Sequence, residues 1–428
     1  METWLKLSLL LCVFGFFKEI RPSEHFIYEY LSGPWRNITG EEVISEVYPV
    51  GTYGYLVLLV VVFLITDLLR YKPLIIVTGL SGIVFSSMLI WTTSLFSLQV
   101  MEIFYSIFMA SEVAYYTYIY AKVDKEHYQA VTSHTRASLL FGRFLAGALS
   151  QVLVTYNLMD YKQLNYITLG AMVVATFWSF LLPSVQNTIY FHREDEEQGM
   201  ISKKEKIKNG ICLMLSEIKE SYTNAYVIYW SLWYALGMAC FLQVQVYMQP
   251  LWQAIIGGTG QTLYNGLVEA ILTIFGFFAA LLVGFIDVDW SKHGRFLLVF
   301  CSAFQGLIVI WAATTANVYI CYFCYIIFSV FYHFAITVSS AEIAKKLKLD
   351  TFGLIFGFNT FVAMIFHSLL TVLVVNDVFG FALNIRQQYI VYGVFCFLIA
   401  CVYFTVSVFW CLRRDRRQFQ VSRDGNEV

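Results

Sequence analysis

Long apolar segments separated by short polar ones dominate the pattern of this 428-residue chain. A helix needs roughly 20 mostly apolar residues to cross a bilayer. Twelve runs approach that length, and their most apolar parts cover residues 4–17, 53–66, 74–91, 101–120, 139–154, 166–183, 226–244, 267–285, 296–313, 318–338, 354–375 and 389–410. The sequence therefore predicts an all-α integral membrane protein with twelve transmembrane helices.

The longest polar stretch lies between the sixth and seventh runs and contains the charged segment "HREDEEQGMISKKEKIKNG". It divides the chain into an N-terminal six-helix bundle (1–185), a cytoplasmic linker loop (186–222), a C-terminal six-helix bundle (223–412) and a cytoplasmic tail (413–428). Two related halves are the plan of the major facilitator superfamily. That superfamily keeps an acidic and basic gate motif between helices two and three, where Asp67 and Arg70 lie in "TDLLRYKP".

The distribution of Lys and Arg predicts the orientation. Cytoplasmic loops carry an excess of these residues. If the helices alternate from a cytoplasmic N-terminus, only Arg36, Lys162 and Arg386 fall in outer loops, and both chain ends are cytoplasmic. The same topology places Asn37, in the sequon "NIT", outside, where N-glycosylation is expected. The predicted location is the plasma membrane.

Composition narrows the function classes. Of the residues, 59% are hydrophobic and 13% charged, and the net charge is −1, so the lipid bilayer and not a nucleic acid is the expected partner. The nine cysteines are scattered, and "CYFC" at Cys321–Cys324 has no second pair to complete a metal site. The sequence contains no Walker A loop, nucleophile elbow or HExxH motif. We therefore expect no enzymatic activity, no metal and no cofactor.

The carboxylate of Glu112 lies in the middle of the fourth apolar run. A charged side chain at the bilayer centre costs roughly 2.5–3.5 kcal/mol on insertion scales, so it must pair or face a cavity. Tyr115 and Tyr116 follow at positions i+3 and i+4, on the same helical face. One interpretation is a site for a flat organic cation, held by the carboxylate and by cation–π contacts. The other is a structural ion pair with Arg136, with the tyrosines as packing.

Three further ionisable residues are candidates for the same site. Glu24 follows Pro22, which breaks a helix, and a broken helix at membrane depth lines a cavity. The alternative is that the helix ends earlier and Glu24 is a solvated loop residue. Glu269 either faces the site or has a structural role, in a salt bridge or at the start of its helix. His367 is either a site residue or a hydrogen-bonded core residue.

Several long motifs occur in order along the chain: "RPSEHFIYEYLSGPWRNIT", "EVYPVGTYGYLVLLVVVFLITDLLRYKP", "SEVAYYTYIYAKV", "LYNGLVEA" and "IFGFNTF". They resemble the thiamine transporter and reduced folate carrier family, over residues 14 to 410. The resemblance implies a twelve-helix facilitator of the plasma membrane that carries a water-soluble vitamin.

The resemblance also bears on the substrate, because thiamine is a cation and reduced folates are anions. The thiamine branch has Glu where the folate carrier has Arg, and this chain has Glu112 there. Tyr115 matches the residue that stacks on thiamine, and Glu24 and Glu269 match two further site carboxylates. The resemblance therefore implies a thiamine transporter with an acidic, aromatic site near the bilayer midplane.

This sequence departs from the thiamine branch at four positions. Gly51 stands in place of a stacking Trp, and restoring that Trp is expected to tighten binding. Val246 replaces an Asn, His367 replaces a Gln, and Ser329 replaces a basic residue. These departures keep a related cation, a thiamine phosphate or a folate as alternative substrates. An organic-anion exchanger of the same family and a non-transporting vitamin-binding receptor are the alternative functions. The coupling ion and the oligomeric state do not follow from the sequence.

Overall fold

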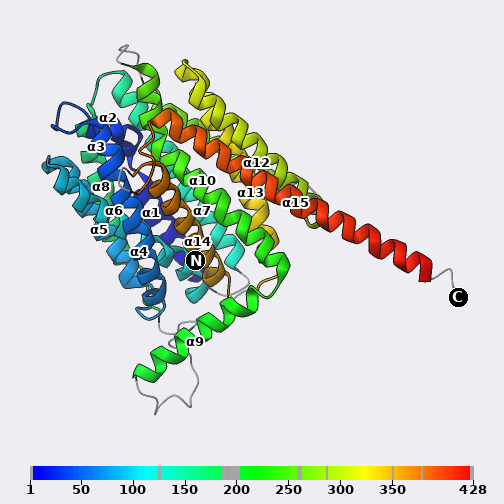
Figure 1. The fold of residues 1–428 in the computed structure, drawn as a ribbon. Coiled ribbons are helices and arrows are strands. Elements are labelled where there is room, and N and C mark those ends of the chain that lie inside the picture. Colours follow the sequence, from blue (N-terminus) through cyan, green and yellow to red (C-terminus); the bar gives the residue numbers. More distant parts are fainter. Residues whose placement is uncertain are drawn as a thin grey trace.

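The computed structural model is a bundle of helices that lie side by side (Figure 1). It describes residues 3–123, 127–185, 190, 203–257, 263–285, 288–348, 351–376 and 379–424, and these ranges contain no β-strand. The elements are α1 (Thr3–Glu19), η1 (Pro22–Phe26), α2 (Ile27–Leu31), α3 (Gly40–Glu42), η2 (Val43–Val47), α4 (Tyr48–Thr66), α5 (Lys72–Trp91), α6 (Leu95–Lys122), α7 (Tyr128–Thr155), α8 (Tyr161–Ser179), α9 (Lys203–Ser221), α10 (Ala225–Ile256), α11 (Asn265–Phe285), α12 (Trp290–Thr314), α13 (Val318–Ala344), α14 (Phe352–Val374) and α15 (Ile385–Asp424).

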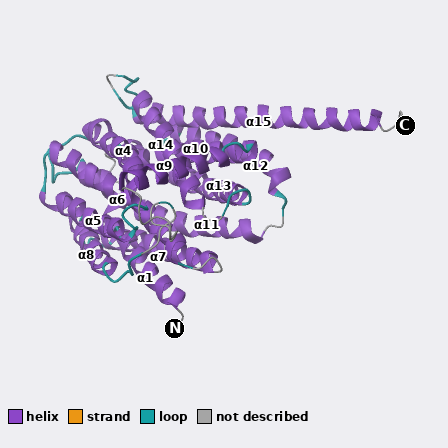
Figure 2. Cartoon of the chain, turned by 90° about the horizontal axis from the view of Figure 1, so that it is seen from below, coloured by secondary structure: helices purple, strands orange, loops and turns teal. Residues whose placement is uncertain are grey.

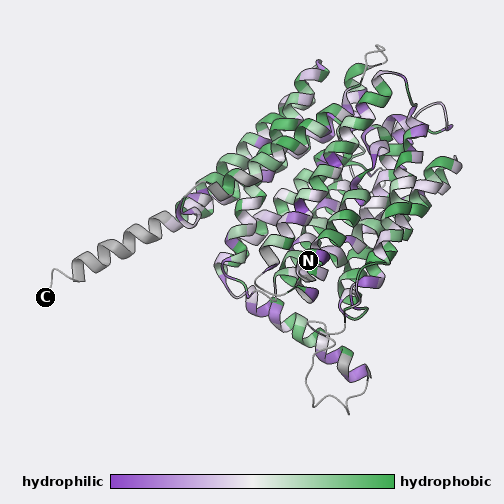
Figure 3. Ribbon diagram, turned by 180° about the vertical axis from the view of Figure 1, so that it is seen from behind, coloured by the Kyte–Doolittle hydropathy of each residue, from purple (hydrophilic) through white to green (hydrophobic). Residues whose placement is uncertain are grey.

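Each predicted apolar run falls on one of these helices. In the described ranges, eight helices are long and apolar enough to cross a membrane: α4, α5, α7, α10, α12, α13, α14 and α15. Figure 3 shows hydrophobic residues along the outer faces of the bundle and hydrophilic residues on α9. The prediction of an all-α membrane protein is therefore confirmed.

The helices pack in two groups that meet along a seam. α1 packs against α7 and α8, and α6 against α4 and α5, while α12 packs against α13 and α15, and α10 against α13 and α14. Across the seam, α7 contacts α11 and α4 contacts α14. In the view of Figure 2, α15 runs along one side of the bundle and extends beyond it.

Close backbone approach makes the α7–α11 contact possible. A Cβ added at Gly147 would lie 2.8 Å from the Gly266 carbonyl oxygen, and one added at Gly266 would lie 3.0 Å from the Gln151 amide nitrogen. Only glycine permits this spacing. Gly147 and Gly266 thus allow α7 and α11 to pack closely along the seam.

The first helix is broken where the sequence predicts. α1 ends at Glu19, Arg21 has φ −127° and ψ 65°, and a 3-10 helix begins at Pro22. Proline fits the first helical position because its missing N–H would have no partner there. The break turns the chain back into the bundle, so the charged residues of this segment lie among helices.

The linker 186–222 is not a loop throughout, because α9 occupies Lys203–Ser221. Its sequence places Ile211, Met214 and Ile218 three and four residues apart, on one helical face. Met214 is 4% exposed and packs with Leu354 of α14. The prediction of a loop missed this short amphipathic pattern within a strongly charged segment.

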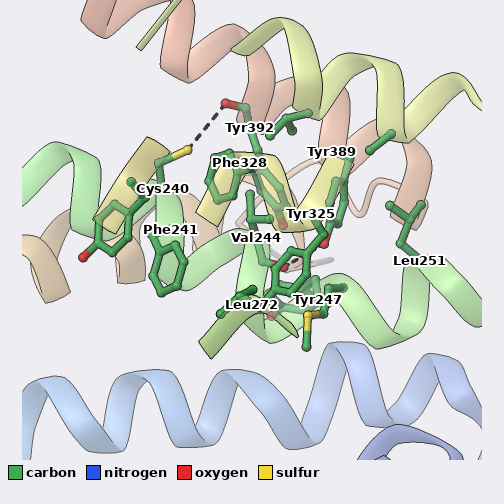
Figure 4. Close-up of a cluster of buried hydrophobic side chains, with 14 of the residues drawn as sticks. Cys240, Phe241, Val244, Tyr247, Leu251, Leu272, Tyr325, Phe328, Tyr389 and Tyr392 are labelled. Atoms are coloured by element: carbon green, nitrogen blue, oxygen red, sulfur yellow. Dashed lines mark hydrogen bonds between the residues drawn. The ribbon is translucent and has the colours of Figure 1, made fainter. Parts of the chain in front are cut away.

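The C-terminal half has a core rich in aromatic residues (Figure 4). Phe241 of α10 stacks on Tyr332 of α13 with ring centroids 4.0 Å apart. Cys321 and Cys324, the CxxC pair, are both free and buried in this half. The described residues contain no group of His, Cys, Asp and Glu side chains that could hold a metal ion.

Candidate functional site

A buried network of ion pairs lies where α1, α6 and α7 meet. The Lys18 ammonium lies 2.8 Å from Oε1 of Glu19 and 2.5 Å from Oε1 of Glu112. Oε2 of Glu19 accepts from Nε of Arg143 at 2.7 Å. Lys18 and Glu19 are each 1% exposed. A buried charge is tolerated only when it is paired, so each of these groups requires the others.

The network continues into the broken segment. Nη2 of Arg21 lies 3.1 Å from Oε2 of Glu19, and Nη1 of Arg21 donates to Oε1 of Glu24. Glu24 is therefore not a solvated loop residue, although 30% of its side chain is accessible. Of the Arg143 side chain, 48% is accessible. This part of the network borders open space.

Glu112 joins the network through Lys18 and not through Arg136. Arg136 is exposed on α7, and the ion pair of Glu112 is with Lys18. The Glu112–Arg136 pair considered from the sequence is therefore wrong. Arg136 lies toward the start of α7, and it is Arg143, two turns further along, that reaches α1.

The two tyrosines after Glu112 have different environments. The Tyr116 hydroxyl donates to Oε1 of Glu112 at 3.0 Å, and the residue is 44% exposed. The Tyr115 hydroxyl donates to the Leu11 carbonyl of α1 at 2.9 Å, and the residue is 0% exposed. In this conformation Tyr116 shares the accessible space with Glu112, whereas Tyr115 packs between α6 and α1.

Glu269 approaches the network from the other half. It lies in the first turns of α11 and accepts from the Tyr325 hydroxyl at 3.1 Å. It is close enough to Arg143 and Glu24 for electrostatic interaction with both. No ion pair of Glu269 occurs among the described side chains, so the structural salt bridge considered from the sequence is not formed there.

Sequence reasoning missed Glu102, one of the acids near this network. Glu102 is on α6 and is 9% exposed, and its carboxylate has no hydrogen bond or ion pair among the described groups. Its carboxylate faces Gly51 of α4, and it lies within electrostatic range of Glu24. Glu102 is the second residue of the apolar run 101–120, and an acid so close to the start of a run does not stand out as one inside the membrane.

A second missed acid, Glu29, lies in α2 and is 7% exposed. Its Oε1 accepts from Nδ2 of Asn265 at 3.4 Å, while its Oε2 has no partner in the described part of the chain. Asn265 belongs to α11, so this contact also joins the two halves.

Of the positions that depart from the thiamine pattern, His367 contacts the other half, and Ser329 and Val246 lie in the C-terminal half. His367 of α14 is 3% exposed, and its Nε2 is 3.3 Å from Oγ1 of Thr52 of α4. Ser329 is fully buried and its hydroxyl has no partner among the described atoms. Val246 is partly buried on α10. Because Thr52 follows Gly51 directly, the contact of His367 joins the two halves next to Gly51.

The predicted gate residues lie at the opposite end of α4. Asp67 accepts from the Tyr71 hydroxyl at 2.5 Å and from the Tyr190 amide at 3.0 Å, and the Tyr190 hydroxyl donates to Glu217 of α9 at 2.9 Å. Arg70 is exposed and has φ 60°, a conformation that costs a non-glycine residue on the order of 1 kcal/mol. A cleft beside Asp67 is lined by both halves and by the linker. Asp67 therefore connects the first half to the linker.

The predicted glycosylation site is accessible. Asn37 is exposed in the segment between α2 and α3. Thr39, the third sequon residue, caps α3 by accepting from the Glu42 amide at 3.2 Å. The sequon thus ends at the start of a short helix.

The sequence is similar to those of known proteins over nearly its whole length. Residues 2–391 match the sequence profile of the reduced folate carrier family. The chain is 36% identical to thiamine transporter 2 of Homo sapiens, over 95% of this chain and 91% of that protein. It is 34% identical to folate transporter 1 of Caenorhabditis elegans, over 95% of this chain and 93% of that protein.

Solved structures show the same fold at low sequence identity. The POT family transporter PepTSo aligns with a TM-score of 0.69 at 12% identity, covering 96% of this chain and 99% of that one. The nucleoside transporter NupG aligns with a TM-score of 0.63 at 11% identity, covering 93% of this chain and 98% of that one. Both are transporters of the major facilitator type, and this likeness concerns the fold alone.

Proposed function

The chain belongs to the reduced folate carrier family, and we propose that it takes up thiamine at the plasma membrane. Members of this family are multi-pass membrane transporters and not enzymes, and the chain is a transporter of the same kind. The choice of thiamine within the family rests on the charge of the candidate site.

The observation that carries the proposal is an excess of carboxylates. Around the network there are five carboxylates and three cations, namely Glu19, Glu24, Glu102, Glu112 and Glu269 against Lys18, Arg21 and Arg143. Two carboxylates thus have no cationic partner among these groups. A positive charge beside a carboxyl group in a medium of low dielectric favours the ionised form of that group, so the two attract each other. A substrate with a fixed positive charge would supply what the cluster lacks.

In the proposed complex, Glu112 holds the positive or aminopyrimidine part of thiamine in competition with Lys18. Tyr116 stacks on a ring from the accessible side, where cation–π contact contributes up to about 2 kcal/mol when dry. Glu24 and Glu269 contribute negative potential from the two halves. Tyr115 takes part if the ligand separates α6 from α1. No cofactor is required.

Transport follows if the two halves rock about this site. We propose twelve transmembrane helices in two bundles of six, with the site near the midplane, both chain ends in the cytoplasm, and Asn37 outside. The seam contacts of α7 with α11 and of α4 with α14 are the surfaces that would separate alternately.

The second candidate is a reduced folate or another organic anion. The observation that favours it is the presence of Lys18, Arg21 and Arg143 in the same network, because these cations could bind the carboxylates of an anionic substrate. The relatives with folate names point the same way. A folate would require the cations to exchange their present partners for the ligand.

Uptake of labelled thiamine by cells expressing the chain tests the proposal. Glu112→Gln should raise the half-saturating thiamine concentration by about tenfold or more, and a tenfold change corresponds to about 1.4 kcal/mol. The exposed acid Glu46 provides the control, since Glu46→Gln should leave uptake unchanged. Equal uptake by wild type and Glu112→Gln would contradict the proposed site.

Competition separates the two substrates. Excess unlabelled thiamine should abolish the signal, while an excess of reduced folate should leave it unchanged. Inhibition by folate at lower concentrations than thiamine would favour the anion exchanger. Binding of thiamine without accumulation would indicate a receptor.

A further inference from the structure

We propose that Gln249 is a positioning residue that fixes Glu24 from the opposite half and closes the seam at that end of the bundle. Gln249 lies in α10, whereas Glu24 lies in η1, so the contact crosses between the two halves. The inference deepens the proposed function, since Glu24 is one of the acids proposed to receive the substrate.

The geometry is a two-point clamp. Oε1 of Gln249 accepts from the Tyr28 amide at 3.0 Å, and Nε2 of Gln249 donates to the Glu24 carbonyl at 2.8 Å. Gln249 is 6% exposed. One side-chain amide therefore holds both ends of a five-residue backbone segment.

The clamp meets a need of the broken helix. Tyr28 is in the first turn of α2, where amide groups have no partner within the helix. A buried amide without a hydrogen bond costs about 1–3 kcal/mol. Gln249 satisfies this donor, so the conformation of the segment depends on a residue of the other half.

The surroundings of the clamp lie on the same seam. Asn265 of α11 contacts Glu29, one residue after Tyr28, and the ring of Tyr247 packs edge-on against Tyr48 with centroids 5.9 Å apart. Any separation of the halves at this end must break the Gln249 bonds. A neighbouring feature of α10 favours movement here, because Pro250 removes the hydrogen bond to the Val246 carbonyl.

The clamp connects ligand binding to seam opening. Glu24 is held by its side chain to Arg21 and by its carbonyl to Gln249. A cation that takes the place of Arg21 would shift η1 and strain the two Gln249 bonds. Loss of the clamp should therefore increase the population in which the seam is open at this end, with or without substrate.

A cysteine accessibility experiment on the full chain tests this. Ser150 of α7 is fully buried at the α7–α11 seam, and a Ser150→Cys reporter should react with a membrane-impermeant maleimide only when that seam opens. Gln249→Met keeps the length of the side chain and removes both bonds. We expect the reporter to react about tenfold faster in the Gln249→Met chain, the rate change for about 1.4 kcal/mol.

Gln243 gives a matched control on the same helix. It is fully buried and also makes two side-chain bonds, to Tyr392 at 3.0 Å and Thr371 at 3.2 Å, but both lie within the C-terminal half. Gln243→Met should leave the reporter rate unchanged. Equal rates in the two variants, at equal surface abundance, would overturn the proposal.

A second variant keeps the test valid if Gln249→Met folds poorly. Gln249→Glu retains an acceptor for Tyr28 but loses the donor to the Glu24 carbonyl, so its reporter rate should lie between the other two. A rate at the wild-type value would count against the clamp. Labelling of the reporter needs no substrate. If Gln249→Met raises the labelling rate but the wild-type chain takes up no thiamine, the proposed substrate is refuted and the clamp is supported.

Discussion

A tryptophan at position 51 tests whether Glu102 occupies the space that a stacking ring would need. Gly51 is on α4 and faces α6, and a Cβ added there would collide with Oε2 of Glu102 and lie 3.3 Å from its Cδ. An indole must therefore displace the Glu102 carboxylate. The sequence alone favours tighter binding on restoring this Trp, and the structure adds the condition that Glu102 must move.

The cost of overpacking and the gain from the added ring nearly cancel, so Gly51→Trp alone should change thiamine binding little. Overpacking costs about 1–3 kcal/mol. A ring against a desolvated cation returns up to about 2 kcal/mol. Gly51→Trp alone should therefore leave thiamine affinity unchanged or lower. Glu102→Ala removes the obstacle, so the double variant should bind more tightly than the two single effects predict, by a coupling of about 0.5–3 kcal/mol.

The assay is a double-mutant cycle on the half-saturating concentration for thiamine uptake. It compares the wild-type chain, Gly51→Trp, Glu102→Ala and the double variant, each normalised to its surface abundance. Additive effects would show that Glu102 and the ring do not share space. An increase in affinity from Gly51→Trp alone, equal to that of the double variant, would refute the reasoning in the same way.

Two further predictions concern single side chains. Tyr116→Phe should weaken thiamine binding severalfold, because it removes the hydroxyl bonded to Glu112, while Tyr115→Phe should lower the melting temperature and leave affinity unchanged; the reverse pattern would show that binding depends on the Tyr115 hydroxyl and not on that of Tyr116. Asn37→Gln should increase the mobility of the protein on a denaturing gel to that of glycosidase-treated wild type, and an unchanged band would contradict glycosylation at this exposed sequon.

The positions of the helices could be predicted because hydrophobicity alone decides which segments enter a bilayer. The break at Pro22 was also predictable, since proline removes a hydrogen bond and its ring clashes with the preceding turn. Helix α9 was missed because the charges around it mask its apolar face. The helix positions and the break at Pro22 thus follow from the local sequence, and the error over α9 is a local one as well.

The partners of the buried charges could not be predicted in the same way. Arg136 and Arg143 are both on α7, and either could have been the neighbour of an acid on another helix. Which one reaches α1 depends on how the two helices rotate and slide against each other, and glycines set that spacing in part. A Cβ at Gly142 would lie 2.7 Å from the Phe16 carbonyl oxygen, so this position brings α7 onto α1 and Arg143 to Glu19.

The ion pairs of Lys18 also bear on the choice between a cationic and an anionic substrate. Lys18 binds Glu112 and Glu19 together, so the proposed site for a cation is already filled by a cation of the protein. A thiamine molecule must therefore displace Lys18 from Glu112, and Glu19 remains to hold the displaced ammonium. An anionic substrate would instead have to draw Lys18 away from both acids, which costs more because two buried carboxylates would lose a partner. The presence of Glu19 beside Lys18 thus favours the cation over the anion, independently of the total charge of the cluster.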